Sequence, residues 1–213
     1  LYLRNWDFTL KPGSVPASIY AEWENQLRFA YMESEIPTKL MSFQGEPLYY
    51  PQMKLVMDWF LYKADKAAVA EKSLKASLMS LEKRLGKDMQ TWRYGQKKNK
   101  HVQISHPLSS AVNDSLRKIF EAGPVARGGN SLTVNNTSYG LNQRSGASFR
   151  FISDTENWDN CLGMNSPGQS GDIRSPFYKN LFNLWVNDRF FPVYYSAKKI
   201  QEVSKEHRTL IPK

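Results

Sequence analysis

Histidine and cysteine side chains, which carry much of protein chemistry, are few in this sequence. The three histidines, His101, His106 and His207, include no pair at the His-x-x-x-His spacing of a metal site. His106 precedes Pro107 and could act as a general base, although a single His-Pro turn more often has a structural hydrogen-bonding role. Cys161 is the only cysteine, and its apolar neighbours favour a small buried side chain over a nucleophile.

Two glycine-containing stretches could in principle bind phosphate or present a nucleophile. Residues 128–130 (Gly-Gly-Asn) and 168–171 (Gly-Gln-Ser-Gly) both lack the spacing of a phosphate-binding loop, and neither is followed by Lys-Ser or Lys-Thr. Ser170 does not lie in a Gly-x-Ser-x-Gly elbow, which is the arrangement that presents a nucleophilic serine in many hydrolases.

Two carboxylate pairs, Glu22/Glu24 and Glu33/Glu35, lie on an early predicted helix. We expect solvated charges there rather than an acid–base pair. From the residues alone, we therefore predict no catalytic residue, no metal ligand and no cofactor in this chain, and we assign no binding residues.

The net charge of +9 is concentrated in one part of the chain, because residues 63–100 hold 11 basic and 4 acidic residues. Such a stripe could contact nucleic acid, but it lacks interleaved aromatic residues and any known nucleic-acid-binding motif. We expect a solvated basic face and consider nucleic acid an unlikely partner. No apolar run approaches the roughly 20 residues that cross a bilayer, so we predict no membrane span.

The stretch around which the chain is organised, residues 165–178, is predicted to be an ordered loop that ends in a helix start. Pro167 restricts one φ angle, and two glycines permit backbone geometries that a Cβ atom would forbid. Ser175 is a suitable N-cap, and Pro176 falls at the first helical position. The helix is predicted over 176–186, with an apolar face formed by Phe177, Leu181, Leu184 and Trp185.

Helical patterns dominate the first part of the chain. We predict one helix from Ser14 or Ser18 to about Glu33, a buried helix over 52–62, and a longer helix over 67–85 that Gly86 ends. Between the first two, Pro37 and the Gly-Glu-Pro step at 45–47 predict irregular turns or short helices.

Strand patterns follow in the second part. We predict strands over 101–105, 131–135, 147–153 and 158–164, with the third and fourth joined as a hairpin, and an extended segment over 189–195. We predict a short helix from Ser109 or Asn113 to Phe120, ended by Gly123-Pro124, and another from Ser196 to about His207. Residues 138–145 are predicted to form a surface loop. The fold class is therefore α+β, mostly helical over 1–90 and an antiparallel sheet with helices over 91–213.

Several dispersed segments resemble one known family when they are taken in order. They are Leu3-x-x-Trp6-Asp7, the helix with Ser14, Ala17, Tyr20 and Trp23, Trp92-Arg93-Tyr94-Gly95, His106-Pro107-Leu108-Ser109, residues 128–135, Ser148-x-Arg150-x-Ile152-x-Asp154, and the loop 165–178. In this order they are similar to the carboxyl-terminal part of the large subunit in the penicillin acylase (penicillin amidase) family. Two departures are Asn130, where the family commonly has Asp, and Lys98, where it often has a Gly-x-x-His step.

The resemblance implies an N-terminal-nucleophile hydrolase with an αββα core. In that family a serine exposed by autocatalytic cleavage attacks an amide, and its own α-amino group, with a pKa near 8, accepts the hydroxyl proton. The segment that matches Leu3-x-x-Trp6-Asp7 lies downstream of both the nucleophile and the oxyanion-binding Asn. The resemblance thus places the catalytic residues outside this chain, which we expect to be inactive alone, and Leu1 at its start is typical of a processed or trimmed product.

The implied partners are the remainder of the same enzyme, namely the small subunit and the amino-terminal part of the large subunit, and a small-molecule N-acyl amide substrate. Penicillins, cephalosporin side chains and acyl-homoserine lactones all remain open as substrates. The implied location is periplasmic or extracellular. The alternative hypothesis is a non-catalytic binding module whose basic face binds carbohydrate or a polyanion.

Overall fold

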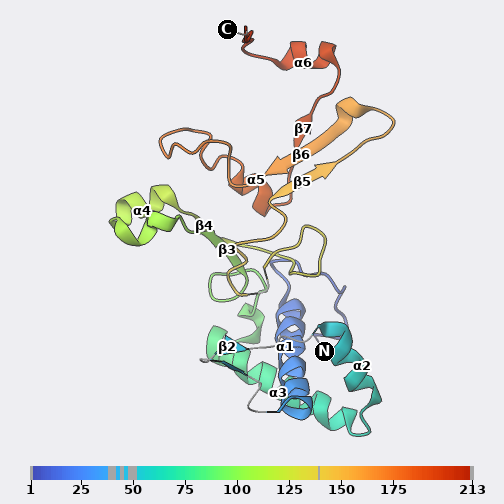
Figure 1. Cartoon of the computed structure of the whole chain (residues 1–213). Coiled ribbons are helices and arrows are strands. Elements are labelled where there is room, and N and C mark those ends of the chain that lie inside the picture. Colours follow the sequence, from blue (N-terminus) through green and yellow to red (C-terminus); the bar gives the residue numbers. More distant parts are fainter. Residues whose placement is uncertain (1, 38–41, 44–45, 48–51, 139, 212–213) are drawn as a thin grey trace. The chain divides into compact units, whose positions relative to one another are not determined.

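The computed structural model describes residues 2–37, 42–43, 46–47, 52–138 and 140–211, and Figure 1 shows their elements. They divide into two compact units, residues 1–101 with 126–128 and residues 102–125 with 129–213, which we describe separately. Helices and small antiparallel sheets make up these units, which confirms the predicted α+β class.

Three helices form most of the first unit: α1 (Val15–Glu35), α2 (Met53–Tyr62) and α3 (Lys66–Leu85). Helix α1 packs against both of the others (Figure 1). Its N-cap is Ser14, whose Oγ accepts a hydrogen bond from the Ala17 N–H at 3.2 Å, so the first of the two predicted caps, Ser14 and Ser18, is confirmed. Helix α3 ends at Gly86, whose φ of 99° suits glycine.

The core of the first unit consists of two clusters that α1 joins. Trp6, Ala17 and Tyr94 form one, and Ile19, Leu81 and Trp92 form the other. The predicted burial of α2 is wrong, because only Val56 of that helix is buried. Within the stretch that we expected to be irregular, the described residues form a short antiparallel pair, β1 (Ser42–Phe43) and β2 (Glu46–Pro47), and the rest lies outside the described residues. A 3-10 helix, η2 (Met89–Thr91), follows α3.

Most of a two-stranded sheet, β3 (His101–Ile104) and β4 (Ala122–Ala126), lies in the second unit, and η3 (Pro107–Ala111) and α4 (Asp114–Phe120) connect its strands. Asn113, one of the two predicted helix starts, caps α4. Gly123-Pro124 does not form a separate turn but lies within β4. A Cβ atom at Gly123 would lie 2.3 Å from the Val102 carbonyl oxygen, so glycine is required where the two strands approach.

A three-stranded antiparallel sheet in the order β5 (Phe149–Ile152), β6 (Cys161–Asn165) and β7 (Phe191–Val193) follows, which confirms the predicted hairpin. The 3-10 helix η4 (Trp158–Asn160) takes the place of the start of the predicted fourth strand. The strand predicted over 131–135 is wrong, because these residues form turns. The short helices α5 (Phe182–Val186) and α6 (Ala197–Val203) complete the unit.

The core of the second unit contains side chains from both sheets and from α5. Its buried members are Val102, Ala122, Met164, Phe182, Trp185 and Val186. Helix α5 supplies three of these six side chains, Phe182, Trp185 and Val186.

Candidate functional site

The glycine-containing loop (residues 165–178) is held by hydrogen bonds to its own backbone. The N–H groups of Gln169 and Ser170 both donate to the Phe177 carbonyl, at 2.9 and 3.2 Å. The Leu181 N–H donates to the Pro167 carbonyl at 3.0 Å, so the two ends of the loop are tied together. A Cβ atom at Gly168 would lie 2.3 Å from the Phe177 carbonyl oxygen, so only glycine fits at this position.

These bonds explain why the helix predicted over 176–186 is wrong at its start. In a helix, the Phe177 carbonyl would accept from the Leu181 N–H. Here both groups bond to the loop instead, and α5 begins only at Phe182. The Ser175 hydroxyl accepts from the Phe177 N–H at 3.1 Å, in a local turn rather than a helix cap. Phe177 is 60% exposed and does not join the predicted apolar face.

Ser170, the one hydroxyl between the two loop glycines, accepts a hydrogen bond from the Asp172 N–H at 3.1 Å. Asp172 is itself paired with Arg174 through two oxygens, at 3.0 Å each. No histidine, lysine or amine lies within hydrogen-bonding distance of Ser170 among the described residues. The loop therefore contains no activated nucleophile and has the geometry of a structural turn.

His106 lies beside this loop and has a structural contact. Its Nδ1 atom accepts from the Leu108 N–H at 3.1 Å and so caps η3, and its ring stacks on Phe120 with centroids 4.8 Å apart. A cavity of about 200 Å³ is lined in part by His106, Phe120, Pro167 and Tyr178. The His-Pro segment and the loop 165–178 thus face one small cavity, although they are about 60 residues apart in sequence.

The last residue of the loop, Tyr178, and the residue after it, Lys179, cap α4, a role that the sequence analysis missed. Lys179 Nζ donates to the carbonyls of Lys118, Ile119 and Glu121 at 2.9, 3.1 and 2.9 Å. The Tyr178 hydroxyl donates to the Phe120 carbonyl at 3.0 Å. The last carbonyls of a helix have no partner within it, and a cation is favoured near them. A lysine next to a tyrosine was the only sequence signal for this contact.

A second arrangement that sequence reasoning missed surrounds Arg150 on β5. Its side chain is buried, and Nη1 donates to Asp188 Oδ1 at 2.7 Å, while Nε donates to the Ala147 carbonyl at 3.0 Å. The guanidinium carbon lies 5.2 Å from the centre of the Trp185 ring. Burial lowers the pKa of Arg150, and the charge of Asp188 opposes that shift. These contacts join β5 to the end of α5.

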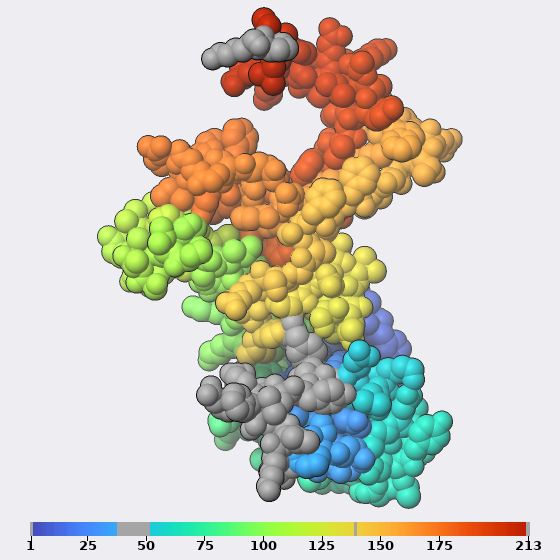
Figure 2. All heavy atoms as spheres, viewed as in Figure 1, coloured from blue at the N-terminus to red at the C-terminus, as the bar shows by residue number. Residues whose placement is uncertain are grey.

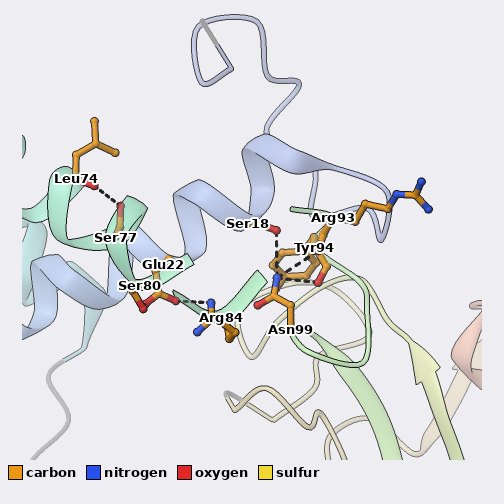
Figure 3. Close-up of polar contacts among 9 residues, drawn as sticks. All are labelled: Ser18, Glu22, Leu74, Ser77, Ser80, Arg84, Arg93, Tyr94 and Asn99. Atoms are coloured by element: carbon orange, nitrogen blue, oxygen red, sulfur yellow. Dashed lines mark hydrogen bonds and ion pairs between the residues drawn. The ribbon is translucent and has the colours of Figure 1, made fainter. Parts of the chain in front are cut away.

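The first unit contains a buried polar cluster, which Figure 3 shows. Glu22 on α1 accepts from the Ser80 hydroxyl and from Arg84 Nη2 on α3, each at 2.7 Å. Asn99 Nδ2 donates to the Ser18 hydroxyl at 3.1 Å and to the Tyr94 carbonyl at 3.0 Å. The cluster connects α1 to α3 and to the segment that follows η2.

The expectation that the early carboxylates are solvated is wrong for Glu22 and Glu24, which are 8% and 4% exposed. Glu24 pairs with the buried Arg28 one turn along α1, so both buried carboxylates have basic partners. Glu33 and Glu35 are exposed, as expected. Because Glu22 is fixed by Arg84 and Ser80 and Glu24 by Arg28, both carboxylates are held in contacts between or within helices, and this cluster has a structural arrangement.

Lys100 and Tyr94 lie near these carboxylates. Burial is the main cause that lowers the pKa of Lys100 to about 8, with the charge of Arg84 adding to the shift and the charges of Glu22 and Glu24 opposing it. Burial also raises the pKa of the Tyr94 hydroxyl.

The remaining candidate residues are not brought together. His101 Nδ1 lies 3.2 Å from the Asn99 carbonyl oxygen, His207 is exposed, and Cys161 is a buried free thiol. Within the described residues, no three side chains of His, Cys, Asp or Glu are grouped so that they could hold a metal ion. Nor does any described helix have both the length and the apolar character needed to cross a membrane.

Comparisons with known proteins support the family resemblance that the sequence indicates. The family model for penicillin amidase matches residues 2–202. The chain is 28% identical over 155 residues to an acyl-homoserine lactone acylase, QuiP, from Pseudomonas fluorescens (strain Pf0-1), which covers 70% of this chain and 18% of the relative. It is 26% identical over 163 residues to QuiP from Pseudomonas aeruginosa, which covers 70% of this chain and 19% of the relative.

A solved structure, the thermostable penicillin G acylase from Alcaligenes faecalis, matches with a TM-score of 0.50 and 13% identity, over 93% of this chain and 38% of that chain. At this identity the match shows a shared fold. The chain spans less than a fifth of the length of the relatives that it matches in sequence.

Proposed function

Because the chain belongs to the penicillin amidase family, whose model matches residues 2–202, we propose that it is the carboxyl-terminal part of an amide-hydrolysing enzyme. The observation that carries the proposal is the match over nearly the whole chain, combined with the lack of a nucleophile–base pair among the described residues near Ser170, His106 and Cys161. The nucleophile would be an N-terminal serine from outside these 213 residues.

In the proposed reaction, the serine hydroxyl attacks the carbonyl carbon of an N-acyl amide, and the α-amino group of the same serine accepts the proton. Backbone and side-chain donors stabilise the tetrahedral oxyanion. The C–N bond then breaks, the amine leaves with the transferred proton, and water hydrolyses the acyl-enzyme to a carboxylate. The contribution of this chain would be structural: its loop 165–178 and the Arg150–Asp188 contact hold α5 against the sheet.

For the substrate, we propose an N-acyl amide and would test an acyl-homoserine lactone first. The sequence relatives are described as acyl-homoserine lactone acylases at 26–28% identity, whereas the penicillin G acylase is 13% identical. The partners would be the small subunit and the amino-terminal part of the large subunit. A periplasmic or extracellular location follows from the same family resemblance.

The test compares the 213-residue chain with the polypeptide that its complete open reading frame encodes. Each is incubated with an N-acyl homoserine lactone and with a chromogenic phenylacetyl amide. We expect turnover of one of the amides by the complete polypeptide and none above blank by the chain alone. Turnover by the chain alone would refute the view that the nucleophile lies elsewhere.

A non-catalytic module that binds a polyanion or carbohydrate is the second candidate function. The observation in its favour is that Lys72, Lys75, Lys83 and Lys87 are all exposed along or just after α3. Binding of heparin or a nucleic acid that weakens steeply with salt would support this function. An affinity that does not change from low to high salt, or no binding at all, would contradict this function and would agree with a basic face that is only solvated.

A further inference from the structure

The three-stranded sheet has one edge that is open for pairing, and its hydrogen-bond register shows which groups lie on it. The Ser166 N–H donates to the Ser148 carbonyl directly opposite, in the same register that pairs Phe149 with Asn165. Bonded and non-bonded pairs alternate in an antiparallel ladder. The Ser148 carbonyl and the backbone groups of Arg150 and Ile152 therefore face β6, and the backbone groups of Phe149 and Phe151 face outward.

The opposite edge of the sheet, β7, is protected. Since Leu162 and Met164 use their backbone groups toward β5, Cys161 and Gly163 bond to Val193 and Phe191 on β7. The backbone of Pro192 then faces outward, and proline has no N–H to donate. Proline on an outer edge is a common means by which proteins prevent unwanted strand pairing.

The open edge at β5 carries no such protection. Its outward positions hold neither proline nor a charged residue, and the side chains of Phe149 and Phe151 are 67% and 47% exposed on one face of the sheet. Among the described residues, no group outside the β5–β6 ladder bonds to their backbone. The hairpin lies at the surface in Figure 2, where β5 and β6 are drawn in amber. An edge that is apolar and unpaired favours association with another strand.

We propose that this edge pairs with an extended segment from the remainder of the amide hydrolase, whose apolar side chains cover Phe149 and Phe151. The inference rests on the proposed function. Two observations favour this occupant: the chain spans less than a fifth of its sequence relatives, and it covers 38% of the solved acylase chain that shares its fold. Most of the polypeptide in such enzymes is therefore available to cover this surface. Main-chain bonds would supply affinity, and the two rings would supply register.

The first experiment measures hydrogen–deuterium exchange at single amides in the 213-residue chain and in the polypeptide encoded by the complete open reading frame. We expect the Phe149 and Phe151 amides to exchange freely in the chain alone and at least roughly tenfold more slowly in the complete polypeptide. The Arg150 amide, which bonds within the sheet, should be protected in both and is the internal control. Equal exchange of Phe149 and Phe151 in the two samples would overturn the proposal.

A second copy of the chain is the other possible occupant. Protection of Phe149 and Phe151 that grows with concentration in the chain alone, together with dimers in sedimentation, would identify that occupant and overturn the proposal. The hydrolysis assay separates the two hypotheses: turnover with unprotected amides refutes the edge pairing alone. Protection without turnover keeps the pairing and refutes the proposed function.

Matched variants test whether the backbone carries the contact. Phe151→Pro removes one outward N–H, as Pro192 does on the other edge, and leaves the β6 ladder in place. Phe151→Ala removes the ring and keeps the N–H. We expect Phe151→Pro to lower the yield of folded complete enzyme more than Phe151→Ala does, and the exposed loop variant Phe177→Ser to leave it unchanged. Equal yields for Phe151→Pro and Phe177→Ser would contradict edge pairing.

Discussion

Arg150 Nη1 donates to Asp188 Oδ1 at 2.7 Å, although the arginine side chain is 4% exposed and the aspartate side chain is 53% exposed. The pair thus joins a buried cation to a half-solvated anion at the end of α5. The Asp188 backbone has a φ of 53°, a left-handed conformation that Asp and Asn adopt more readily than other residues with a side chain. The position of the Asp188 carboxylate therefore depends on both its left-handed backbone and the ion pair with Arg150.

We predict that Asp188→Asn destabilises the chain by about 1–2 kcal/mol, less than a fully buried pair would lose, because Asp188 is half exposed. Asparagine keeps the left-handed backbone and the side-chain shape, so the change isolates the charge. Urea unfolding at low salt measures the effect. The control is Asp172→Asn, which removes an exposed pair with Arg174 and should not shift the midpoint measurably.

A second prediction concerns the two kinds of carboxylate on α1. Glu22→Ala leaves Arg84 and Ser80 without their acceptor in a buried site, so we expect a loss of about 2–4 kcal/mol. Glu33→Ala, on the same helix but exposed, should change the free energy of unfolding by less than about 0.5 kcal/mol. Urea midpoints of the two variants check this contrast, and equal losses would show that the buried cluster contributes little to stability.

The elements that sequence reasoning predicted well depend on neighbouring residues. The Ser14 cap, the Gly86 stop of α3 and the hairpin of β5 and β6 each follow from residues a few positions apart. The prediction of a helix over 176–186 is wrong at its start because the Phe177 carbonyl accepts hydrogen bonds from the Gln169 and Ser170 N–H groups. A helical pattern in the sequence does not reveal such bonds.

The polar contacts were harder to predict because their partners are distant in sequence. Glu22 is buried because Arg84 lies opposite it on another helix, 62 residues away. Lys179 caps α4 across about 60 residues. Spacing in the sequence cannot distinguish such a carboxylate or lysine from a solvated one. The contacts of these residues were therefore identified only from the structure.

A third prediction uses the lowered pKa of Lys100, which is about 8 in the folded chain against an ordinary value of 10.5. Between pH 8 and 10.5 the unfolded chain binds more protons than the folded chain, so the free energy of unfolding rises with pH in this window. We expect a gain on the order of 1–2 kcal/mol between pH 8 and 9.5 from this group.

The measurement is the urea midpoint at pH 7.5, 8.5 and 9.5, compared with the variant Lys100→Met. Staying below pH 10 avoids Tyr94, whose raised pKa has the opposite effect: stability falls once the tyrosine of the unfolded chain ionises near pH 10. Lys100→Met should be more stable than the native chain at pH 7.5 and should show a shallower rise. A rise of the same steepness in both proteins would assign it to other groups.

The last prediction tests whether the glycines of the loop 165–178 have different roles. A Cβ atom at Gly168 would lie 2.3 Å from the Phe177 carbonyl oxygen and 2.4 Å from that of Tyr178, and both are backbone atoms. The loop must therefore open to accept Gly168→Ala, and the bonds that Gln169 and Ser170 donate to Phe177 would weaken with it. Since this loop leads into α5 and its three core residues, we expect Gly168→Ala to lower the free energy of unfolding by about 2–3 kcal/mol.

The control is Gly171→Ala. At Gly171 nothing lies within 4 Å of the added Cβ atom and φ is not left-handed, so this change should leave the stability unaltered. Thermal unfolding of the two variants decides the matter, because similar melting temperatures would mean that the loop does not fix the position of α5.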